Sequence, residues 1–359
     1  MNGYRFLRPF LFQGDSEQIH EQAIRGLHRV SQSARLCAGL DRLYGFEHKK
    51  LETRLFGQTF SSPLGIAAGF DKNGVAAPAL RALGFAFVEI GTVTPLPQTG
   101  NPKPRMFRLK NDIALINRMG FPNQGVAEVG RHLGRTYRAN GYLGLNVGPN
   151  KESVAAGTAD TDCLTVIERL AGFPGYIVVN VSSPNTAQLR QLQGKEALHQ
   201  LLSRIVAERT ARSAHPLLVK IAPDLTDAEL DDILQVVTDL NLDGIVATNT
   251  TIARPANLQH AAKTEPGGLS GRPLRERSRA VVRRIYQRTS GLLPIIAAGG
   301  IFTGADVLAA IQSGATLVQT YTGFVYRGPG MAERVKEELV MAMEREGIRS
   351  LDDIRGIGL

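Results

Sequence analysis

Residues 177–186 read Ile-Val-Val-Asn-Val-Ser-Ser-Pro-Asn-Thr. β-Branched apolar residues lead directly into small, polar and turn-forming residues, and a helical pattern follows. A nearly continuous apolar run, without alternation of apolar and polar residues, is typical of a strand that is covered on both faces in a parallel sheet. This stretch therefore predicts one strand–loop–helix unit of an α/β protein.

The same pattern recurs from residue 64 onward. The predicted strands are Leu64–Phe70, Phe85–Thr92, Tyr142–Val147, Ile177–Val181, Leu217–Ile221, Gly244–Thr248, Pro294–Ala298 and Leu317–Tyr321. The predicted helices are Val75–Leu83, Gly125–Ala139, Asp160–Ala171, Glu196–Ala211, Asp227–Leu240, Leu274–Arg288, Ala305–Ser313 and Met331–Arg345. Alternating strands and helices in this number predict a (β/α)8 TIM barrel.

Two segments lie outside this repeat. Residues 1–45 predict an N-terminal helical extension, in which Asp15 is placed to cap a helix, so we expect a division into residues 1–45 and a barrel of residues 46–359. The stretch Pro95–Asn117 is long, basic and rich in proline. A loop of this length inside a compact domain is usually a lid or a binding element.

Composition excludes several classes of protein. The 359 residues are 43% hydrophobic and 21% charged, as in ordinary globular proteins. The two cysteines, Cys37 and Cys163, lack the spacing of a disulfide scaffold or of a cysteine-rich metal site. No apolar run approaches the roughly 20 residues of a membrane span, and no signal-peptide pattern is present, so we expect the chain to stay in the cytoplasm. The net charge of +9 favours anionic partners, but no nucleic-acid-binding module is recognisable.

Polar residues at the predicted strand ends are the candidates for chemistry, since barrel active sites lie there. Asparagine and Ser-Pro are also common turn residues, and each of them taken alone is more often a turn than a site. Lys220 lies inside an apolar strand, where an ammonium group needs a partner or a ligand. The glycines after the last two strands fit either tight turns or a phosphate site. Together, amides and hydroxyls suit a planar heterocycle and lysines suit a carboxylate or a phosphate, while no metal-ligand cluster is found.

Five motifs carry a resemblance to a known family. They occur in order at the strand ends and read Ala67-Ala68-Gly69-Phe70-Asp71-Lys72, Asn117-Arg118-Met119-Gly120-Phe121, Asn180-Val181-Ser182-Ser183-Pro184-Asn185-Thr186, Thr248-Asn249-Thr250-Thr251 and Gly267-Gly268-Leu269-Ser270-Gly271. On these motifs the sequence resembles dihydroorotate dehydrogenase, in its membrane-associated, quinone-dependent class (class 2).

The resemblance implies the oxidation of (S)-dihydroorotate to orotate through FMN in de novo pyrimidine biosynthesis. Ser183 falls at the position of the catalytic base that accepts the C5 proton, where the soluble class has cysteine. The implied substrate-binding residues are Lys72, Asn117, Arg118, Met119, Gly120, Phe121, Asn180, Asn185, Asn249 and Thr250. The implied FMN-binding residues are Ala67, Ala68, Gly69, Phe70, Asp71, Thr92, Asn146, Asn180, Lys220, Thr248, Gly271, Gly300, Tyr321 and Thr322.

The electron acceptor implied by the resemblance is a membrane quinone. No Gly-x-Gly-x-x-Gly follows a strand and no cysteine cluster suits an iron–sulfur centre, so NAD reached through a partner subunit is disfavoured and no obligatory protein partner is expected. The apolar N-terminal residues beside Arg5 and Arg8 either lie on anionic lipid or only pack on the barrel. The resemblance favours peripheral contact with the cytoplasmic face of a bacterial inner membrane, with His20 and Arg108 as candidates for the quinone head group. Pro9 is expected to interrupt any regular helix there.

Two other functions remain open at this stage. One is an FMN barrel enzyme that uses a soluble acceptor such as fumarate or NAD. The other is a barrel that binds a phosphate group without catalysis and therefore carries no flavin.

Overall fold

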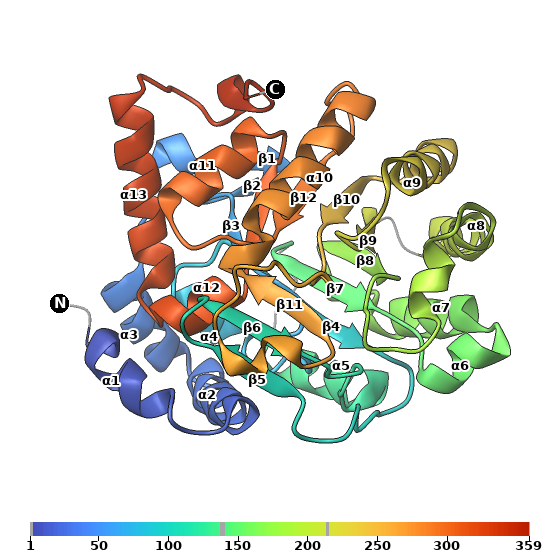
Figure 1. The fold of residues 1–359 in the computed structure, drawn as a ribbon, viewed down its shortest axis with the longest axis horizontal. Coiled ribbons are helices and arrows are strands. Elements are labelled where there is room, and N and C mark those ends of the chain that lie inside the picture. Colours follow the sequence, from blue (N-terminus) through green and yellow to red (C-terminus); the bar gives the residue numbers. More distant parts are fainter. Residues whose placement is uncertain (1–2, 137–140, 213–214, 359) are drawn as a thin grey trace.

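Eight parallel strands form a closed barrel in the computed structural model, which describes residues 3–136, 141–212 and 215–358 (Figure 1). Around the barrel the strands follow chain order, and each pairs with the next through a parallel register. They are β3 (Leu64–Ile66), β4 (Phe87–Val93), β7 (Leu143–Val147), β8 (Tyr176–Asn180), β9 (Leu217–Ile221), β10 (Gly244–Ala247), β12 (Ile295–Ala298) and β13 (Leu317–Thr320). The predicted (β/α)8 barrel is confirmed.

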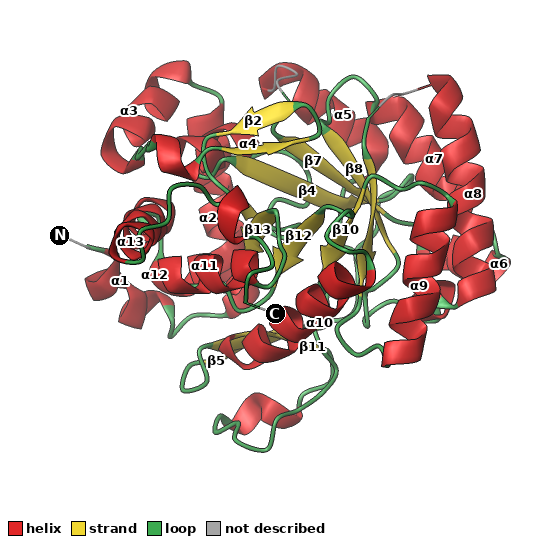
Figure 2. Ribbon diagram, turned by 90° about the horizontal axis from the view of Figure 1, so that it is seen from above, coloured by secondary structure: helices red, strands yellow, loops and turns green. Residues whose placement is uncertain are grey.

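Helices surround the strands, as Figure 2 shows from above. The helices of the repeat are α4 (Ala77–Ala82), α5 (Gly125–Thr136), α7 (Ala159–Leu170), α8 (Lys195–Arg212), α9 (Asp227–Asp239), α10 (Arg275–Arg288), α11 (Gly304–Gln312) and α13 (Met331–Arg345). All eight were predicted, although the expected end of α5 at Ala139 lies outside the described residues. Shorter elements join them: β1 (Thr53–Leu55), β2 (Gln58–Phe60), α6 (Lys151–Ala156), α12 (Thr322–Arg327), and the 3-10 turns η1 (Lys49–Leu51), η2 (Leu189–Gln193), η3 (Ala261–Thr264), η4 (Arg272–Leu274) and η5 (Asp352–Ile354).

Apolar side chains fill the N-terminal end of the barrel. The first residues of β4, β8 and β13, which are Phe87, Tyr176 and Leu317, are fully buried there, and the β1–β2 hairpin adds Phe60. Closely packed side chains at this end leave no room for a ligand. Any ligand site in the barrel must therefore lie at the C-terminal end of the strands.

Gly65 on β3 makes room for one of these rings. A Cβ atom at Gly65 would come 2.5 Å from the ring of Phe87, which is fully buried. We expect Gly65→Ala to lower the free energy of unfolding by about 1–3 kcal/mol through overpacking. Gly134→Ala on α5 is the matched control, because no atom lies within 4 Å of its added methyl group. That control should be neutral or stabilising by up to about 1 kcal/mol in the same urea unfolding measurement, and equal losses in the two variants would contradict the assignment.

The segment Pro95–Asn117 is not the long loop that the sequence suggested. It contains β5 (Met106–Leu109) and β6 (Ala114–Asn117), which form an antiparallel sheet with β11 (Gly268–Gly271). The prediction was wrong because β6 pairs with β11, a partner about 150 residues away that no local pattern reveals. The sheet buries an apolar face of its own, built around Leu109, Ile116 and Leu269.

The N-terminal extension is helical, as predicted. It consists of α1 (Tyr4–Leu11), α2 (Ser16–Ser31) and α3 (Ala34–Tyr44), and the Asp15 carboxylate caps α2 by accepting the N–H groups of Glu17 and Gln18. The expected interruption at Pro9 is wrong, because Pro9 lies inside α1. Tertiary contacts hold this helix: Tyr4 Oη donates to the carbonyl of Val325 and Arg8 donates to that of Tyr326. No described helix combines the length and the apolar character that a membrane crossing needs.

Candidate active site

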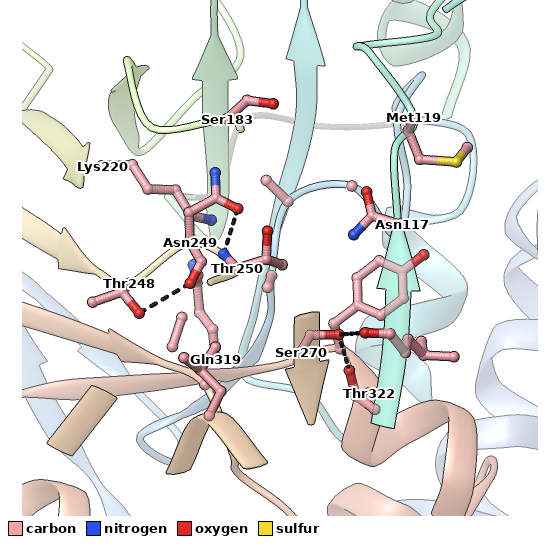
Figure 3. Close-up of a pocket in the computed structure, with 18 of the residues that line it drawn as sticks. Asn117, Met119, Ser183, Lys220, Thr248, Asn249, Thr250, Ser270, Gln319 and Thr322 are labelled. Carbon is pink, nitrogen blue, oxygen red and sulfur yellow. Dashed lines mark hydrogen bonds between the residues drawn. The ribbon is translucent and has the colours of Figure 1, made fainter. Parts of the chain in front are cut away.

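A cavity opens at the C-terminal ends of the barrel strands, next to β6 and β11 (Figure 3). It holds about 1150 Å³ of space free of protein atoms, part of it open to solvent. Residues at or just beyond the ends of β3, β4, β8, β9, β10, β12 and β13 line it, together with residues of the β5–β6–β11 sheet and the loop after β6. Its wall combines apolar residues with a few convergent polar side chains, as the walls of small-molecule and cofactor sites usually do.

Most of the predicted site residues line this one cavity. They are Ala67, Ala68, Gly69, Lys72, Thr92, Asn117, Met119, Gly120, Phe121, Asn180, Ser183, Asn185, Lys220, Thr248, Asn249, Thr250, Gly271, Gly300, Tyr321 and Thr322. They come from the ends of seven barrel strands, from β6 and the loop after it, and from the end of β11, so only the folded barrel brings them together.

Four of the residues predicted to bind FMN or substrate lie outside the cavity wall. The guanidinium of Arg118 turns away to Glu265, with Nη1 at 2.7 Å from Oε2, and it stacks over the Phe107 ring. The Asp71 carboxylate accepts the N–H groups of Val75 and Ala76 ahead of α4, and burial raises its pKa. Phe70 packs against Tyr321 and Phe324. These three side chains are therefore held by contacts outside the cavity lining.

Asn146, the fourth of them, anchors a chain of polar side chains along the cavity. Thr92 Oγ1 donates to Asn146 Oδ1 at 2.6 Å, and Asn180 Nδ2 donates to Thr92 Oγ1 at 2.9 Å. Ser182 Oγ in turn donates to Asn180 Oδ1 at 2.9 Å and accepts from Asn249 Nδ2 at 3.0 Å. Each amide therefore has a fixed orientation before any ligand arrives, because both of its ends have a defined partner.

Ser183 lies in the loop that follows β8 and is almost fully buried. Its Oγ accepts a hydrogen bond from the backbone N–H of Asn185 at 3.2 Å. The Asn185 side chain donates to Asn117 Oδ1 at 3.3 Å, which links this loop to the end of β6. Ser183 and Asn117 therefore belong to one connected part of the cavity wall.

The N-terminal extension reaches this wall through His20 on α2. His20 Nε2 lies 3.3 Å from Lys72 Nζ, and its ring stacks on Tyr321 with centroids 6.2 Å apart. Burial, reinforced by the charge of Lys72, lowers the pKa of His20 well below its usual value. Burial also lowers the pKa of Lys72 to about 8. His20 itself lies outside the cavity, behind Tyr321 and Lys72.

Arg108 on β5 lies under the same extension. Its guanidinium stacks over the Phe12 ring at 4.2 Å and donates weakly to the carbonyl of Gly14 at 3.5 Å. Its buried Nε has no hydrogen-bond partner among the described residues. Arg108 and His20, the two residues predicted to meet the quinone, thus both lie between the extension and the barrel.

Several buried polar residues near the cavity were not predicted. Arg105 binds the Glu17 carboxylate with Nη2 at 2.7 Å from Oε1, which fastens α2 to the segment before β5. Inside the barrel, Glu89 on β4 is the partner of Lys220, and Gln319 on β13 donates to Glu89. A signal existed for Glu89, because it stands inside an apolar strand as Lys220 does, and two such charges of opposite sign suggest a pair.

Comparison with known proteins agrees with this geometry. The family model for dihydroorotate dehydrogenase matches residues 50–343. A relative from Rhodospirillum rubrum, called dihydroorotate dehydrogenase (quinone), is 47% identical over 98% of this chain and 94% of its own length. The mitochondrial enzyme of Mus musculus that bears the same name is 44% identical, over 96% of this chain and 87% of its own length.

A solved structure also resembles this one. The crystal structure of DHODH from Eimeria tenella in complex with ferulenol superposes with a TM-score of 0.86 at 38% identity, and the match covers 96% of this chain and 95% of that one. Fold, sequence and the motifs at the strand ends thus agree over nearly the whole chain. The chain belongs to the dihydroorotate dehydrogenase family, in its quinone-dependent class.

Proposed function

We propose that this protein oxidises (S)-dihydroorotate to orotate in pyrimidine biosynthesis, with FMN as its prosthetic group and a membrane quinone as the electron acceptor. Members of the family are flavin-dependent. The observation that carries the proposal is that one cavity joins Ser183, a candidate base, to Lys220 and to a row of asparagine side chains. A base, a cation and oriented amides are what oxidation of a planar amide ring beside a flavin requires.

The cavity fits a flavin in the chemistry of its wall. Gln319 Oε1 and Thr250 Oγ1 are buried, lack a partner among the described residues and line the cavity, so they suit the polar edges of bound rings. Gly299 and Gly300 have positive φ angles of 126° and 72°, and a Cβ atom at Gly300 would collide with the Arg275 backbone. Only glycine lets the chain approach so closely, which leaves backbone groups free for a phosphate.

We assign the cofactor and substrate residues on this basis. FMN would supply the acceptor for the hydride that leaves C6 of the substrate. FMN would be held by Ala67, Ala68, Gly69, Thr92, Asn180, Lys220, Thr248, Gly271, Gly300, Tyr321 and Thr322, supported by Phe70, Asp71 and Asn146. Substrate would be held by Lys72, Asn117, Asn180, Asn185, Asn249 and Thr250, and by the loop of Met119, Gly120 and Phe121, which Arg118 anchors from outside.

Ser183 is the residue proposed to take the C5 proton. The hydroxyl can take this proton only as it passes its own proton to a water molecule, and the Asn185 N–H that Oγ already accepts stabilises the negative charge that the oxygen carries at that point. Near-complete burial keeps bulk water from competing for the proton. Asn117 and Asn185 hold each other and thereby hold the substrate edge next to the base.

The quinone half-reaction is assigned to the N-terminal extension. Phe6, Leu7 and Phe10 on α1 are exposed by 75%, 60% and 72%, which is unusual for large apolar side chains on one short helix. Together with Arg5 and Arg8 they suit peripheral contact with an anionic membrane, on the cytoplasmic face in a bacterial cell. Quinone would enter under α1 and α2, and its head group would meet His20 and Arg108.

A visible spectrum tests the proposal. The purified protein should be yellow, and dihydroorotate added without oxygen should bleach the flavin, which a water-soluble quinone analogue should then restore. A colourless protein would favour a phosphate-binding barrel without catalysis. Reoxidation by fumarate or NAD but not by the quinone would identify an enzyme that uses a soluble acceptor.

The lowered pKa of Lys72 predicts how orotate binding changes with pH. Because the pKa is about 8, the ammonium form that binds the orotate carboxylate prevails below pH 8 and is lost above it. We therefore expect the Kd for orotate to rise above pH 8, by up to about tenfold per pH unit, and to level off at the higher pKa that Lys72 has when the anion is bound. Titration of the flavin spectrum with orotate measures this, and Lys72→Met should bind weakly at every pH. A Kd that stays constant from pH 7 to 10 would rule out this role.

A further inference from the structure

Glu89 is a carboxylate sealed inside the barrel. It lies on β4, and no part of it is exposed to solvent. Its Oε1 accepts hydrogen bonds from Asn146 Nδ2 at 2.8 Å and from Lys220 Nζ at 3.4 Å, and its Oε2 accepts one from Gln319 Nε2 at 2.6 Å. The three donors come from β7, β9 and β13, so the carboxylate joins strands from around the barrel.

Glu89 lies one layer beneath the cavity. Lys220 and Gln319 both line the cavity, as Figure 3 shows, whereas Glu89 does not belong to its wall. Beneath this layer the barrel is apolar apart from the Tyr176 hydroxyl, which accepts from Gln319 Nε2 at 3.5 Å. Glu89 therefore acts on a bound molecule through Lys220 and Gln319 and not by touching it.

Stability alone does not explain a carboxylate at this depth. Burying an ion pair costs several kcal/mol of desolvation per ion, and apolar residues can often replace such a pair without loss of stability. The effect that an apolar residue could not supply is electrostatic. Lys220 presents a positive charge to the cavity, and the negative charge of Glu89 at 3.4 Å opposes its field. In a low-dielectric interior, two such charges influence each other strongly.

We propose that Glu89 is a positioning residue that lowers the reduction potential of the bound flavin by partly neutralising Lys220. The inference rests on the proposed function. A hydride from the substrate carries two electrons and one proton, so the neutral oxidised flavin becomes an anion. Lys220 stabilises that anion, and Glu89 limits the stabilisation. The reduced flavin then remains a strong enough reductant to pass its electrons to a quinone.

The test is the midpoint potential of the flavin in the purified Glu89→Gln holoenzyme, measured by photoreduction against reference dyes. Glutamine keeps the size of the side chain. Its amide N–H group can be accepted by Gln319 Oε1, which has no partner among the described residues, once the Gln319 amide rotates. We expect the potential to rise, with at least a tenfold shift of the reduction equilibrium, which is about 30 mV for two electrons. Reoxidation by a quinone should slow in parallel.

Tyr176→Phe is the matched control, because it removes a neutral group from the same network and should leave the potential unchanged. An unchanged or lower potential in Glu89→Gln, with flavin bound, overturns the inference. If the glutamine variant does not fold, Glu89→Asp makes the same test, because it withdraws the carboxylate from Lys220 and should raise the potential by a smaller amount. An unmodified protein without flavin would overturn the proposed function, and this inference with it.

Discussion

Ser183→Ala is expected to slow flavin reduction by dihydroorotate by about 10²–10⁴-fold, the usual contribution of a positioned base. The flavin should stay bound, because Ser183 contacts the loop backbone and not the chain of amides around Thr92 and Asn180. The loop should also keep its shape, since the Asn185 side chain remains bonded to Asn117. Anaerobic stopped-flow absorbance of the flavin measures this step apart from the quinone reaction.

The Ser183→Cys variant tests whether the Ser183 hydroxyl acts as a base or has only a structural role. A thiol has a pKa of about 8.5, far below that of an alcohol, so the cysteine variant should regain part of the lost rate and reach its plateau at a lower pH than the wild type. Undiminished reduction in Ser183→Ala would remove Ser183 from the role of base. Equal losses in the alanine and cysteine variants over the whole pH range would indicate a packing role.

Glu17→Ala is expected to have the largest effect on stability, about 3–5 kcal/mol, since it leaves Arg105 buried without its counter-ion. Glu17 and Arg105 are only 5% and 7% exposed, and the guanidinium holds both carboxylate oxygens. His20 lies one turn farther along α2, so we expect turnover with quinone to fall more than flavin reduction does. Urea unfolding and the two half-reactions, measured separately, check this.

Glu21→Ala is the control for that experiment. Glu21 is half-exposed and pairs with Lys103 at 3.3 Å, a surface contact worth about 1 kcal/mol or less. A comparable loss of stability in the two variants would show that the buried Glu17–Arg105 pair stabilises the fold no more than a surface ion pair does.

Acid should also weaken the ion pair between Glu17 and Arg105. Burial by itself would raise the pKa of Glu17, but the hydrogen bonds and charge of Arg105 outweigh it and lower the pKa. A carboxylate whose pKa is lowered by folding contributes its full stability above its unfolded pKa of about 4.3 and loses it as pH falls through the folded value. The difference in stability between wild type and Glu17→Ala should therefore shrink below about pH 4.

Local signals explain how well the barrel could be predicted. Strand β9 and helix α13 have the predicted bounds. An apolar run of five residues and a helical pattern of fifteen can each be recognised from the local sequence alone. The glycines and polar residues that follow each run mark the strand ends. The cavity residues among them were therefore predictable once the barrel was.

Partners that are distant in the chain explain what was missed. β5 and β6 follow a proline-rich stretch and pair with β11, which stands far along the sequence. Arg118 follows Asn117 directly in a cavity motif, yet its side chain meets Glu265 on the other side of the loop. Pro9 lies within a helix because contacts of Tyr4 and Arg8 with the end of the barrel hold that helix in place.

The sequence by itself determined the repeating strand–helix unit, and with it the closed barrel and the end at which ligands bind, because periodicity and turn residues act over a few positions. Only the tertiary structure decided which charges face each other: Glu17 with Arg105, Glu89 with Lys220, and His20 with Lys72. Electrostatic and hydrogen-bond energies depend on distances through space, and chain closure sets those distances between residues that the sequence keeps far apart.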